Sequence, residues 1–376
     1  MNLPAKAWSL TSEDGFAGRN SKNLLVAFLQ GLDYFYPVTV MRSILIILFW
    51  CSILTVQSQD NHLIKGLTLV APPRQFSGNP FLKIKDMNSD WIAVIPYGFC
   101  RQNEPIVHYD HGSSEKRWWG ESRKGVEETI CMAKDNHIKV MLKPQIWVGD
   151  DWIGNLDYKT VAQWEKWESS YEAFIIPFAE MCELYDVEML CIGTEIKQSV
   201  KTRPRFWNNL IVKIRNVYKG KLTYAANWDE YDIITFWSKL DFIGVDAYFP
   251  LCDDPDPDVN KMMQAWEPIL DKLERTSKKY QKPILYTEYG YLSVDGCGGK
   301  TWELESNLHS KKYNPQAQAT CLNVLLECSS KHSCWQGGFL WKWYDDPTAM
   351  HHGIEKDHSP QGKPGEDVVR KWYARL

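Results

Sequence analysis

The sequence lacks the patterns that mark several large classes of protein. Its 43 Lys and Arg residues are outnumbered by 47 Asp and Glu residues, so no excess of positive charge indicates binding to nucleic acid or to anionic lipid. No G-x-G-x-x-G motif indicates a dinucleotide cofactor. The cysteines and histidines show no paired spacing typical of zinc ligands, and His351-His352 alone is too weak a signal. The sequence therefore predicts no metal, no cofactor and no nucleic-acid partner.

Long apolar runs are also scarce, and the clearest one lies near the N-terminus. Residues 41–58 read MRSILIILFWCSILTVQS, with a positive charge at Arg42 and an end, Val56-Gln57-Ser58, that resembles a signal-peptidase site. The apolar part is too short to span a bilayer as a helix. We predict a secretory signal peptide over 41–58, a secreted extracellular protein and no membrane association after cleavage; a membrane anchor is the alternative. Residues 1–40 are predicted to be a disordered upstream extension.

Cysteines are frequent enough after this signal to make disulfides an expectation. The chain contains ten cysteines, of which Cys51 belongs to the predicted signal peptide. Secretion favours disulfide formation. Nine is an odd number, so at least one thiol stays free or pairs elsewhere, and spacing does not reveal the pairing.

Past residue 60, short β-branched and aromatic runs alternate with longer stretches of helical spacing. Strands are predicted at 64–72, 91–98, 138–147, 188–196, 221–228, 241–249, 283–291 and 337–345. Helices are predicted at 121–136, 164–185, 204–218, 262–280, 315–330 and 365–376. Strands that alternate with helices pair in parallel through right-handed crossovers. The pattern predicts an α/β fold, a (β/α)8 TIM barrel forming a single catalytic domain over 60–376; an open doubly wound sheet is the alternative.

Two glutamates stand at the ends of predicted strands, where such barrels carry their catalytic side chains. Glu195 closes the run at 188–196, and Glu288 closes the run at 283–291. The period of two predicts that Glu195 shares a side with Cys191 and Gly193, and that Glu288 shares a side with Tyr286. Two carboxyl groups about 5–5.5 Å apart are the arrangement of a retaining glycosidase. The alternative for either is a surface charge salt-bridged to a lysine or arginine.

Aromatic and polar side chains gather at the same strand ends. An indole stacks on the C–H face of a sugar ring, while amides, carboxylates and hydroxyls bind its hydroxyl groups. The predicted substrate-binding residues are Lys143, Trp147, Asn227, Trp228, Asp246, Tyr248, Trp341 and Trp343. Further candidate platforms are Trp118, Trp119 and Trp152. For any single tryptophan, a place in the core is the alternative.

Five segments resemble glycoside hydrolase family 113. They are GTEI (193–196), NWDEYD (227–232), FWSKLDFIGVDAYFPL (236–251), YTEYGY (286–291) and WKWYDDP (341–347). The resemblance runs from about residue 64 to the C-terminus. It implies a retaining barrel glycosidase in which Glu195 is the acid/base and Glu288 the nucleophile, and endo-hydrolysis of β-1,4-mannans. The expected partner is therefore a mannan or glucomannan polysaccharide or oligosaccharide, and we expect a monomer.

One position departs from the wider superfamily of retaining barrel glycosidases. Many members have Asn before the acid/base, where it contacts the sugar 2-hydroxyl, whereas this chain has Thr194. A mannoside carries that hydroxyl axially, so a different contact is expected. Trp341 is the expected platform under the sugar at the cleavage point, and Tyr248 is expected to hold Glu288 by a hydrogen bond. The alternative functions are another retaining β-glycosidase, such as an exo-β-mannosidase or a β-glucanase, and a catalytically silent carbohydrate-binding barrel.

Overall fold

Eight parallel strands close into a barrel in the order β1-β11-β10-β9-β8-β7-β5-β2. Most of their residues are buried, as expected for strands that are covered on both faces. The (β/α)8 barrel predicted from the sequence is confirmed. The strands are β1 (Ile64–Leu69), β2 (Trp91–Val94), β5 (Lys139–Leu142), β7 (Met189–Thr194), β8 (Lys221–Asn227), β9 (Ile243–Asp246), β10 (Ile284–Tyr289) and β11 (Trp335–Trp343).

The structure, a computed structural model, describes residues 62–109, 118–149, 151–347 and 354–376. The predicted signal peptide at 41–58 and the predicted extension at 1–40 lie outside the described residues, and both stay predictions. The domain boundary at residue 60 also stays a prediction. No helix in the described ranges combines the length and the apolar character needed to cross a bilayer.

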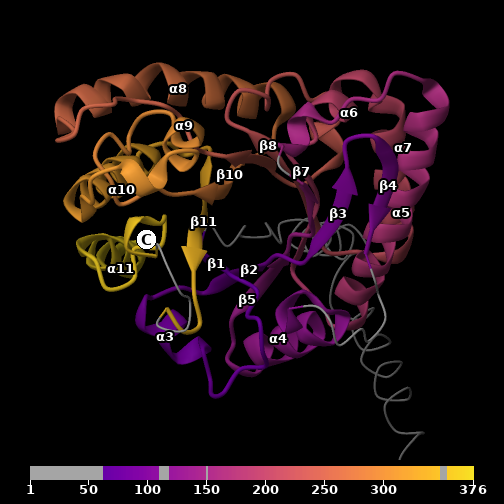
Figure 1. Cartoon of the computed structure of the whole chain (residues 1–376), viewed down its shortest axis with the longest axis horizontal. Coiled ribbons are helices and arrows are strands. Elements are labelled where there is room, and N and C mark those ends of the chain that lie inside the picture. Colours follow the sequence, from indigo (N-terminus) through magenta and orange to yellow (C-terminus); the bar gives the residue numbers. More distant parts are fainter. Residues whose placement is uncertain (1–61, 110–117, 150, 348–353) are drawn as a thin grey trace, which may run out of the picture. The chain divides into compact units, whose positions relative to one another are not determined.

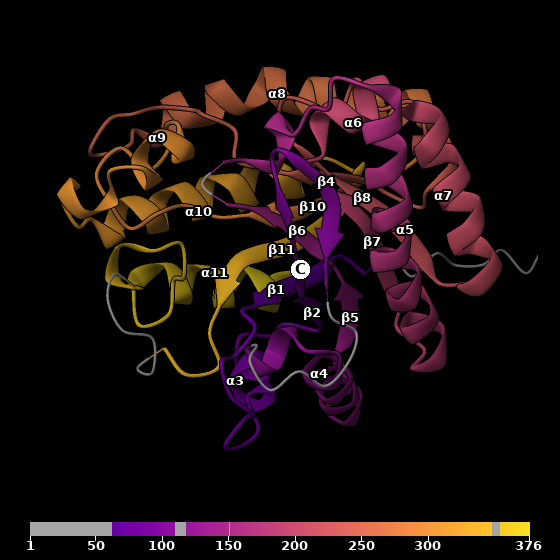
Figure 2. The same ribbon diagram turned by 45° about the vertical axis from the view of Figure 1, so that its right-hand side comes forward.

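Helices surround the strands, which lie at the centre in both views of Figure 1 and Figure 2. The six predicted helical stretches correspond to α4, α5, α7, α8, α10 and α11. The helices are α3 (Phe81–Asp86), α4 (Arg123–Asp135), α5 (Val161–Leu184), α6 (Lys197–Thr202), α7 (Pro204–Val217), α8 (Val259–Tyr280), α9 (Thr301–Glu305), α10 (Pro315–Ser330) and α11 (Pro364–Arg375). Short 3-10 turns are η1 (Trp119–Glu121), η2 (Ile153–Asn155), η3 (Trp237–Lys239), η4 (Leu308–Ser310) and η5 (Ile354–Lys356).

Local sequence signals explain where the main helices begin. Thr160 and Gln163 form a reciprocal capping box at the start of α5. Asn314 accepts a hydrogen bond from the Ala317 amide at the start of α10, where Pro315 occupies the first helical position. Such caps satisfy backbone N–H groups that have no partner inside the helix.

Two runs that the sequence predicts as single strands are each split by a proline. The run at 91–98 forms β2 and then β3 (Tyr97–Arg101), and the run at 138–147 forms β5 and then β6 (Gln145–Val148). Pro96 and Pro144 stand at the two breaks, because proline has no N–H to donate to a strand ladder. β3 pairs with β6 and with β4 (Glu104–His108) in a separate three-stranded sheet. This second sheet carries Gln145 and Trp147 beyond the end of the barrel strands.

Two hydrophobic cores hold the fold together. The smaller one, the inner core, fills the barrel, because all its members come from barrel strands or from Phe242 just before β9. The larger one, the outer core, joins the strands to the surrounding helices. Residues of the inner core are Ile64, Trp91, Ala93, Met141, Met189, Cys191, Ala225, Phe242, Leu285 and Phe339.

Candidate active site

Strict alternation of side chains does not hold at the end of β7. Cys191 lies in the inner core, but a Cβ atom on Gly193 would meet Trp207 and Tyr224 of the outer core. The pairing of β7 with β8 shifts register between Cys191 and Thr194. The prediction that Cys191 and Gly193 share a side is therefore wrong, because an irregularity in the ladder re-aims the residues that follow it.

A register shift also changes the side-chain direction at the end of β10. Tyr286 faces outward and stacks on Trp266 of α8, with ring centroids 6.5 Å apart. Its pairing with β9 shifts register between Tyr286 and Glu288, and Glu288 lines a cavity at the strand ends. Tyr286 and Glu288 thus lie on different sides, contrary to the prediction from the period of two. The register shift aims the carboxylate at the cavity.

A similar irregularity separates Trp341 from Trp343 in β11. Trp341 lines the cavity, whereas Trp343 is buried in the outer core. The β1–β11 pairing shifts register between Leu67 and Leu69, opposite this part of β11. Trp343 therefore has no exposed surface to offer a substrate, which contradicts its prediction as a substrate-binding residue.

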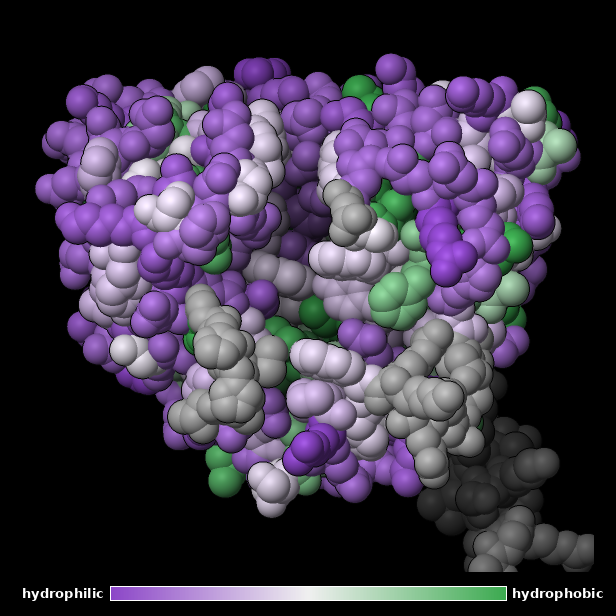
Figure 3. Space-filling view, in the orientation of Figure 1, coloured by the Kyte–Doolittle hydropathy of each residue, from purple (hydrophilic) through white to green (hydrophobic). Residues whose placement is uncertain are grey.

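A cavity of about 700 Å³ opens at the carboxyl ends of the barrel strands, and Figure 3 shows a hollow near the centre of the face toward the viewer. This volume suits a small ligand or part of a polymer. Glu195 and Glu288 both line it. Five of the predicted substrate-binding residues also line it: Trp147, Asn227, Trp228, Tyr248 and Trp341.

Glu288 accepts hydrogen bonds from three side chains. Lys143 Nζ and Gln145 Nε2 donate to Oε1, the latter at 2.9 Å. Tyr248 OH donates to Oε2 at 2.8 Å. Three donors hold this carboxyl group in one orientation. The predicted hydrogen bond between Tyr248 and Glu288 is confirmed.

Lys143 pairs with the carboxyl groups of both Glu288 and Asp246. Lys143 Nζ lies 3.6 Å from Asp246 Oδ1, which also accepts a hydrogen bond of 2.7 Å from Thr287 Oγ1. Burial acts to lower the pKa of Lys143, but the charges of Asp246 and Glu288 outweigh it and hold the pKa above its ordinary value. Lys143 therefore stays cationic between the two carboxyl groups.

The structure revises the prediction that Lys143 and Asp246 bind sugar hydroxyls. Both side chains are completely buried, and neither belongs to the cavity lining. Lys143 contacts Glu288 and Asp246, and Asp246 also accepts from Thr287, so the pair acts by positioning the Glu288 carboxylate.

Replacing Lys143 by methionine is expected to lower the free energy of unfolding by about 3–5 kcal/mol. The substitution leaves the buried Asp246 and Glu288 with no cation between them. Urea unfolding measures the effect. The matched control is Lys213→Met, because Lys213 pairs with Glu172 on the surface at 2.6 Å and such pairs contribute about 0–1 kcal/mol. An equal loss in both variants would contradict the buried role of Lys143.

Glu195 lies in a different environment from Glu288. Its backbone adopts a left-handed conformation, with φ of 53°, and its amide donates to Ala225 O at 2.8 Å. Trp152 Nε1 donates to Oε2 at 2.6 Å. Burial raises the pKa of Glu195 to about 8, and the negative charge of Glu288 adds to this, while the Trp152 hydrogen bond opposes it. Glu195 is therefore protonated at neutral pH.

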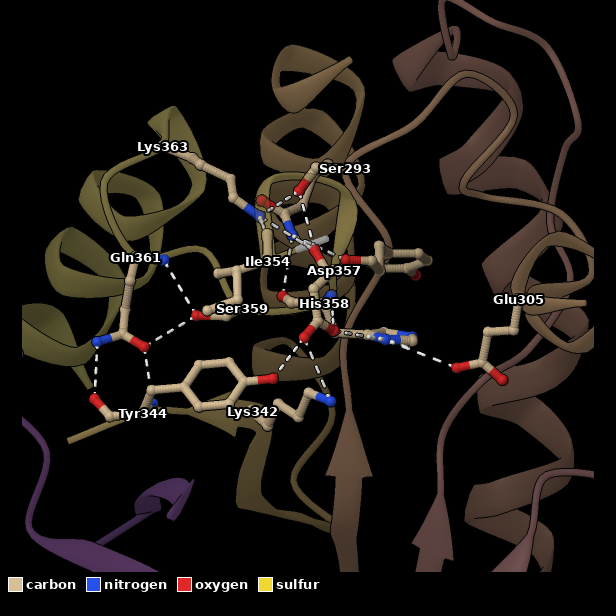
Figure 4. A network of polar contacts seen from close by, with 12 residues as sticks. Ser293, Glu305, Lys342, Tyr344, Ile354, Asp357, His358, Ser359, Gln361 and Lys363 are labelled. Carbon is tan, nitrogen blue, oxygen red and sulfur yellow. Dashed lines mark hydrogen bonds and ion pairs between the residues drawn. The ribbon is translucent and has the colours of Figure 1, made fainter. Parts of the chain in front are cut away.

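A network of polar contacts surrounds Asp357 and His358 (Figure 4). The buried His358 ring packs against the Tyr248 ring, with centroids 5.8 Å apart. Its neighbour Asp357 accepts a hydrogen bond of 2.6 Å from Tyr344 OH and pairs with Lys342 at 3.3 Å. These contacts attach the segment after β11 to the strand end that carries Trp341. The same segment thus contacts both Lys342 of β11 and Tyr248, which donates to Glu288.

Several residues of the cavity were not among the predicted site residues. Gln145 follows the Pro144 break, and Trp302 lies on α9, where it stacks on Trp228 with centroids 5.8 Å apart and planes at 11°. Trp302 is not at the end of a strand, so the strand pattern of the sequence carries no signal for its place in the cavity. Other lining residues that the sequence did not single out are Tyr97, Asp151, Asn155 and Glu305.

The additional tryptophan platforms have mixed outcomes. Trp152 lines the cavity and binds Glu195. Trp118 and Trp119 do not line it; Trp118 is exposed, and Trp119 packs edge-on against Phe76 at 5.3 Å. Both lie just before α4 in the chain.

Comparison with known families identifies the class of enzyme. The sequence profile of Glycoside Hydrolase Family 113 matches residues 78–363. The chain belongs to this family. The resemblance seen in the five sequence segments is confirmed, and the protein is a glycoside hydrolase. A comparison with curated proteins gave no significant match.

Solved structures share the barrel fold. A GH113 β-1,4-mannanase in a complex superposes with a TM-score of 0.71 at 24% identity, covering 84% of this chain and all of that one (100%). The GH113 β-mannanase from Alicyclobacillus acidocaldarius in complex with ManMIm gives a TM-score of 0.72 at 21% identity, covering 84% and 98%. A β-glucuronidase from Ruminococcus gnavus gives 0.54 at 14% identity, covering 83% and 50%.

Proposed function

We propose that this glycoside hydrolase is an endo-β-1,4-mannanase that acts on mannan and glucomannan with retention of configuration. Glu288 is the nucleophile and Glu195 the acid/base. The observation that carries the proposal is the contrast between two carboxyl groups of one cavity. Glu288 is fixed by three donors, whereas burial and the charge of Glu288 keep Glu195 protonated.

This contrast supplies both groups that the first chemical step needs. Glu288 attacks the anomeric carbon, the bond to the leaving oxygen breaks, and Glu195 transfers its proton to that oxygen. A glycosyl ester of Glu288 results. Glu195, now ionised, takes a proton from water, whose oxygen attacks the anomeric carbon and releases Glu288 as a carboxylate. Glu195 is protonated again at the end of the cycle.

Mannan as the substrate is supported by the family and by the similar structures, which are those of GH113 β-mannanases. The cavity offers flat platforms at several points: Trp341 at the end of β11, Trp147 on the second sheet, and the Trp228–Trp302 stack. Trp147 is 56% exposed, so a chain bound there remains open to solvent. Platforms spread along an open cavity suit a polymer that continues in both directions, which is the requirement of endo-action.

A parallel assay on mannan, glucomannan, cellulose and xylan tests the proposal. Reducing ends are expected to appear on the first two substrates, and short oligosaccharides are expected among the early products. Free mannose as the first product would indicate an exo-β-mannosidase, and preference for cellulose would indicate a β-glucanase. No release from any substrate would favour a silent carbohydrate-binding barrel.

We also propose that the protein is secreted, with residues 41–58 as its signal peptide. The short apolar run after Arg42 supports this. Expression of the full chain in a secreting host should deliver a product to the medium whose N-terminus lies close after Ser58. Retention of the apolar run in a membrane fraction would favour the anchor instead.

In an oxidising extracellular environment, Cys297 and Cys321 are the pair of thiols best placed to form a disulfide. The cysteines in the described part of the chain are free thiols, and the buried Cys297 and Cys321 bring their sulfur atoms to 3.7 Å. We expect these two thiols to form a disulfide by exchange with an oxidised low-molecular-weight disulfide, which is reduced to two thiols. The bridge closes a loop with a sequence separation of 24 and is expected to stabilise the fold by about 3 kcal/mol.

Non-reducing peptide mapping after treatment with oxidised glutathione tests this pairing. A cross-linked peptide pair containing Cys297 and Cys321 is expected, and Cys321→Ser should remove both the cross-link and the gain in melting temperature. Cys131→Ser is the control, because Cys131 is exposed on α4. A different dominant pair would contradict the prediction.

A further inference from the structure

Glu230 is a carboxylate that the proposed mechanism does not use. It follows β8, is completely buried and lies outside the cavity lining. Neither of its carboxyl oxygens has a hydrogen-bond partner. Burial raises the pKa of Glu230 to about 8, although the charge of Lys197 acts against this. A buried carboxyl group without hydrogen bonds lowers the stability of the fold.

Those neighbours connect Glu230 to the proposed acid/base. Lys197 Nζ lies 3.5 Å from Glu230 Oε1 and 3.0 Å from Asp229 Oδ2. The same ammonium group lies over the indole ring of Trp152, 5.6 Å from its centroid. Trp152 Nε1 in turn donates to Glu195 at 2.6 Å. Glu230, Lys197, Trp152 and Glu195 thus form a contiguous series.

Glu230 also acts on Glu195 through its charge. Glu230 ionises as the pH rises through about 8. Its negative charge then raises the pKa of Glu195, as the charge of Glu288 does, while Lys143 lowers it. Other titratable groups interact electrostatically with Glu195 or Glu230. They are Asp246 of β9, Tyr224 of β8, Asp229 and Lys197. Only Glu230 among the carboxylates of this set is completely buried without any hydrogen bond.

We propose that Glu230 is a positioning residue which, together with Lys197 and Trp152, sets the proton affinity of Glu195 and hence the alkaline limit of the enzyme. The inference rests on the proposed function for its meaning in catalysis. It deepens that function by assigning the regulation of the acid/base to a residue that substrate does not touch.

Carbodiimide labelling of Glu195 measures this affinity without relying on activity. The reagent modifies protonated carboxyl groups, and Glu195 lines the cavity. Modification is followed by peptide mass spectrometry between about pH 5 and about pH 9. Glu230→Gln is expected to lower the labelling midpoint of Glu195 by about half to one pH unit, and the alkaline limb of kcat/KM on mannan is expected to move by the same amount.

Three variants make the outcome decisive. Glu230→Asp keeps the carboxyl group, so the midpoint for labelling of Glu195 should stay close to that of the wild type. Glu230→Leu removes the charge without burying an amide, and it replaces Glu230→Gln if that protein fails to fold. Glu172→Gln, on the surface of α5, is the control. An unchanged midpoint in folded Glu230→Gln or Glu230→Leu overturns the proposal. Loss of mannan hydrolysis by the wild type would instead overturn the proposed function and leave the labelling result standing.

Discussion

Replacing Glu288 by alanine is expected to lower kcat on mannan by about 10⁴-fold or more, because no other group can form the glycosyl ester. The cavity contains further carboxylates, but Glu288 is the one fixed by three donors at the end of β10. Initial rates from a reducing-sugar assay measure the loss. Asp246 still pairs with Lys143 in the variant, so the barrel is expected to fold.

Two controls separate loss of chemistry from loss of structure. The circular dichroism spectrum of Glu288→Ala should match that of the wild type. Glu172→Ala, the same substitution at a surface position of α5, should retain wild-type kcat. Azide, a small nucleophile, is expected to restore turnover of an activated aryl mannoside in Glu288→Ala, with a glycosyl azide as product. Near wild-type hydrolysis of mannan without azide would refute Glu288 as the nucleophile.

Replacing Glu195 by alanine is expected to have the second largest effect, with a fall in kcat on mannan of about 10²–10⁴-fold. The leaving oxygen of mannan needs a proton, whereas a dinitrophenolate leaving group does not. On a dinitrophenyl mannoside the first step therefore remains fast, and hydrolysis of the ester becomes slow because no base activates water. A burst of dinitrophenolate and a covalent adduct in the intact mass are the expected signs. Equal losses on both substrates would contradict an acid/base role.

The pH profile of the wild type provides a further check on the same residue. The pKa of Glu195 is raised to about 8, so the proton needed for catalysis is present below this pH and is lost above it. We therefore expect kcat/KM on mannan to fall as the pH rises through about 8. The limb should be absent from the first step with a dinitrophenyl mannoside. A limb of equal size with that substrate would assign it to another group.

The order of strands and helices could be predicted from the sequence because it depends on local signals. Stretches of helical spacing and β-branched or aromatic runs alternate often enough along the chain to predict a (β/α)8 barrel. Pro96 and Pro144 were equally visible, but their effect was not anticipated: they end two barrel strands and start a second sheet. Glu195 and Glu288 were identifiable because a charge at the end of an apolar strand is unusual.

Other parts of the site depend on contacts between distant segments. Lys143 and Asp246 carry no local signal that distinguishes a buried ion pair from a group that binds substrate. The prediction that Trp343 binds substrate is wrong, because a register shift depends on how two strands pair and is not visible in the sequence of one strand. Trp302 reaches the cavity from a loop helix, and its stacking on Trp228 depends on how that loop folds.

By itself the sequence determined the barrel, its family and the two glutamates, since these follow from periodicity and from the residues that end each strand. Only the tertiary structure decided which side each strand-end residue faces, and which carboxyl group keeps its proton. Proton affinity depends on burial and on charges from many segments. The pKa of Glu195 is raised by burial and by the charges of Glu288 and Glu230. Glu230 follows β8 and Glu288 lies in β10, so both are distant from Glu195 in the sequence.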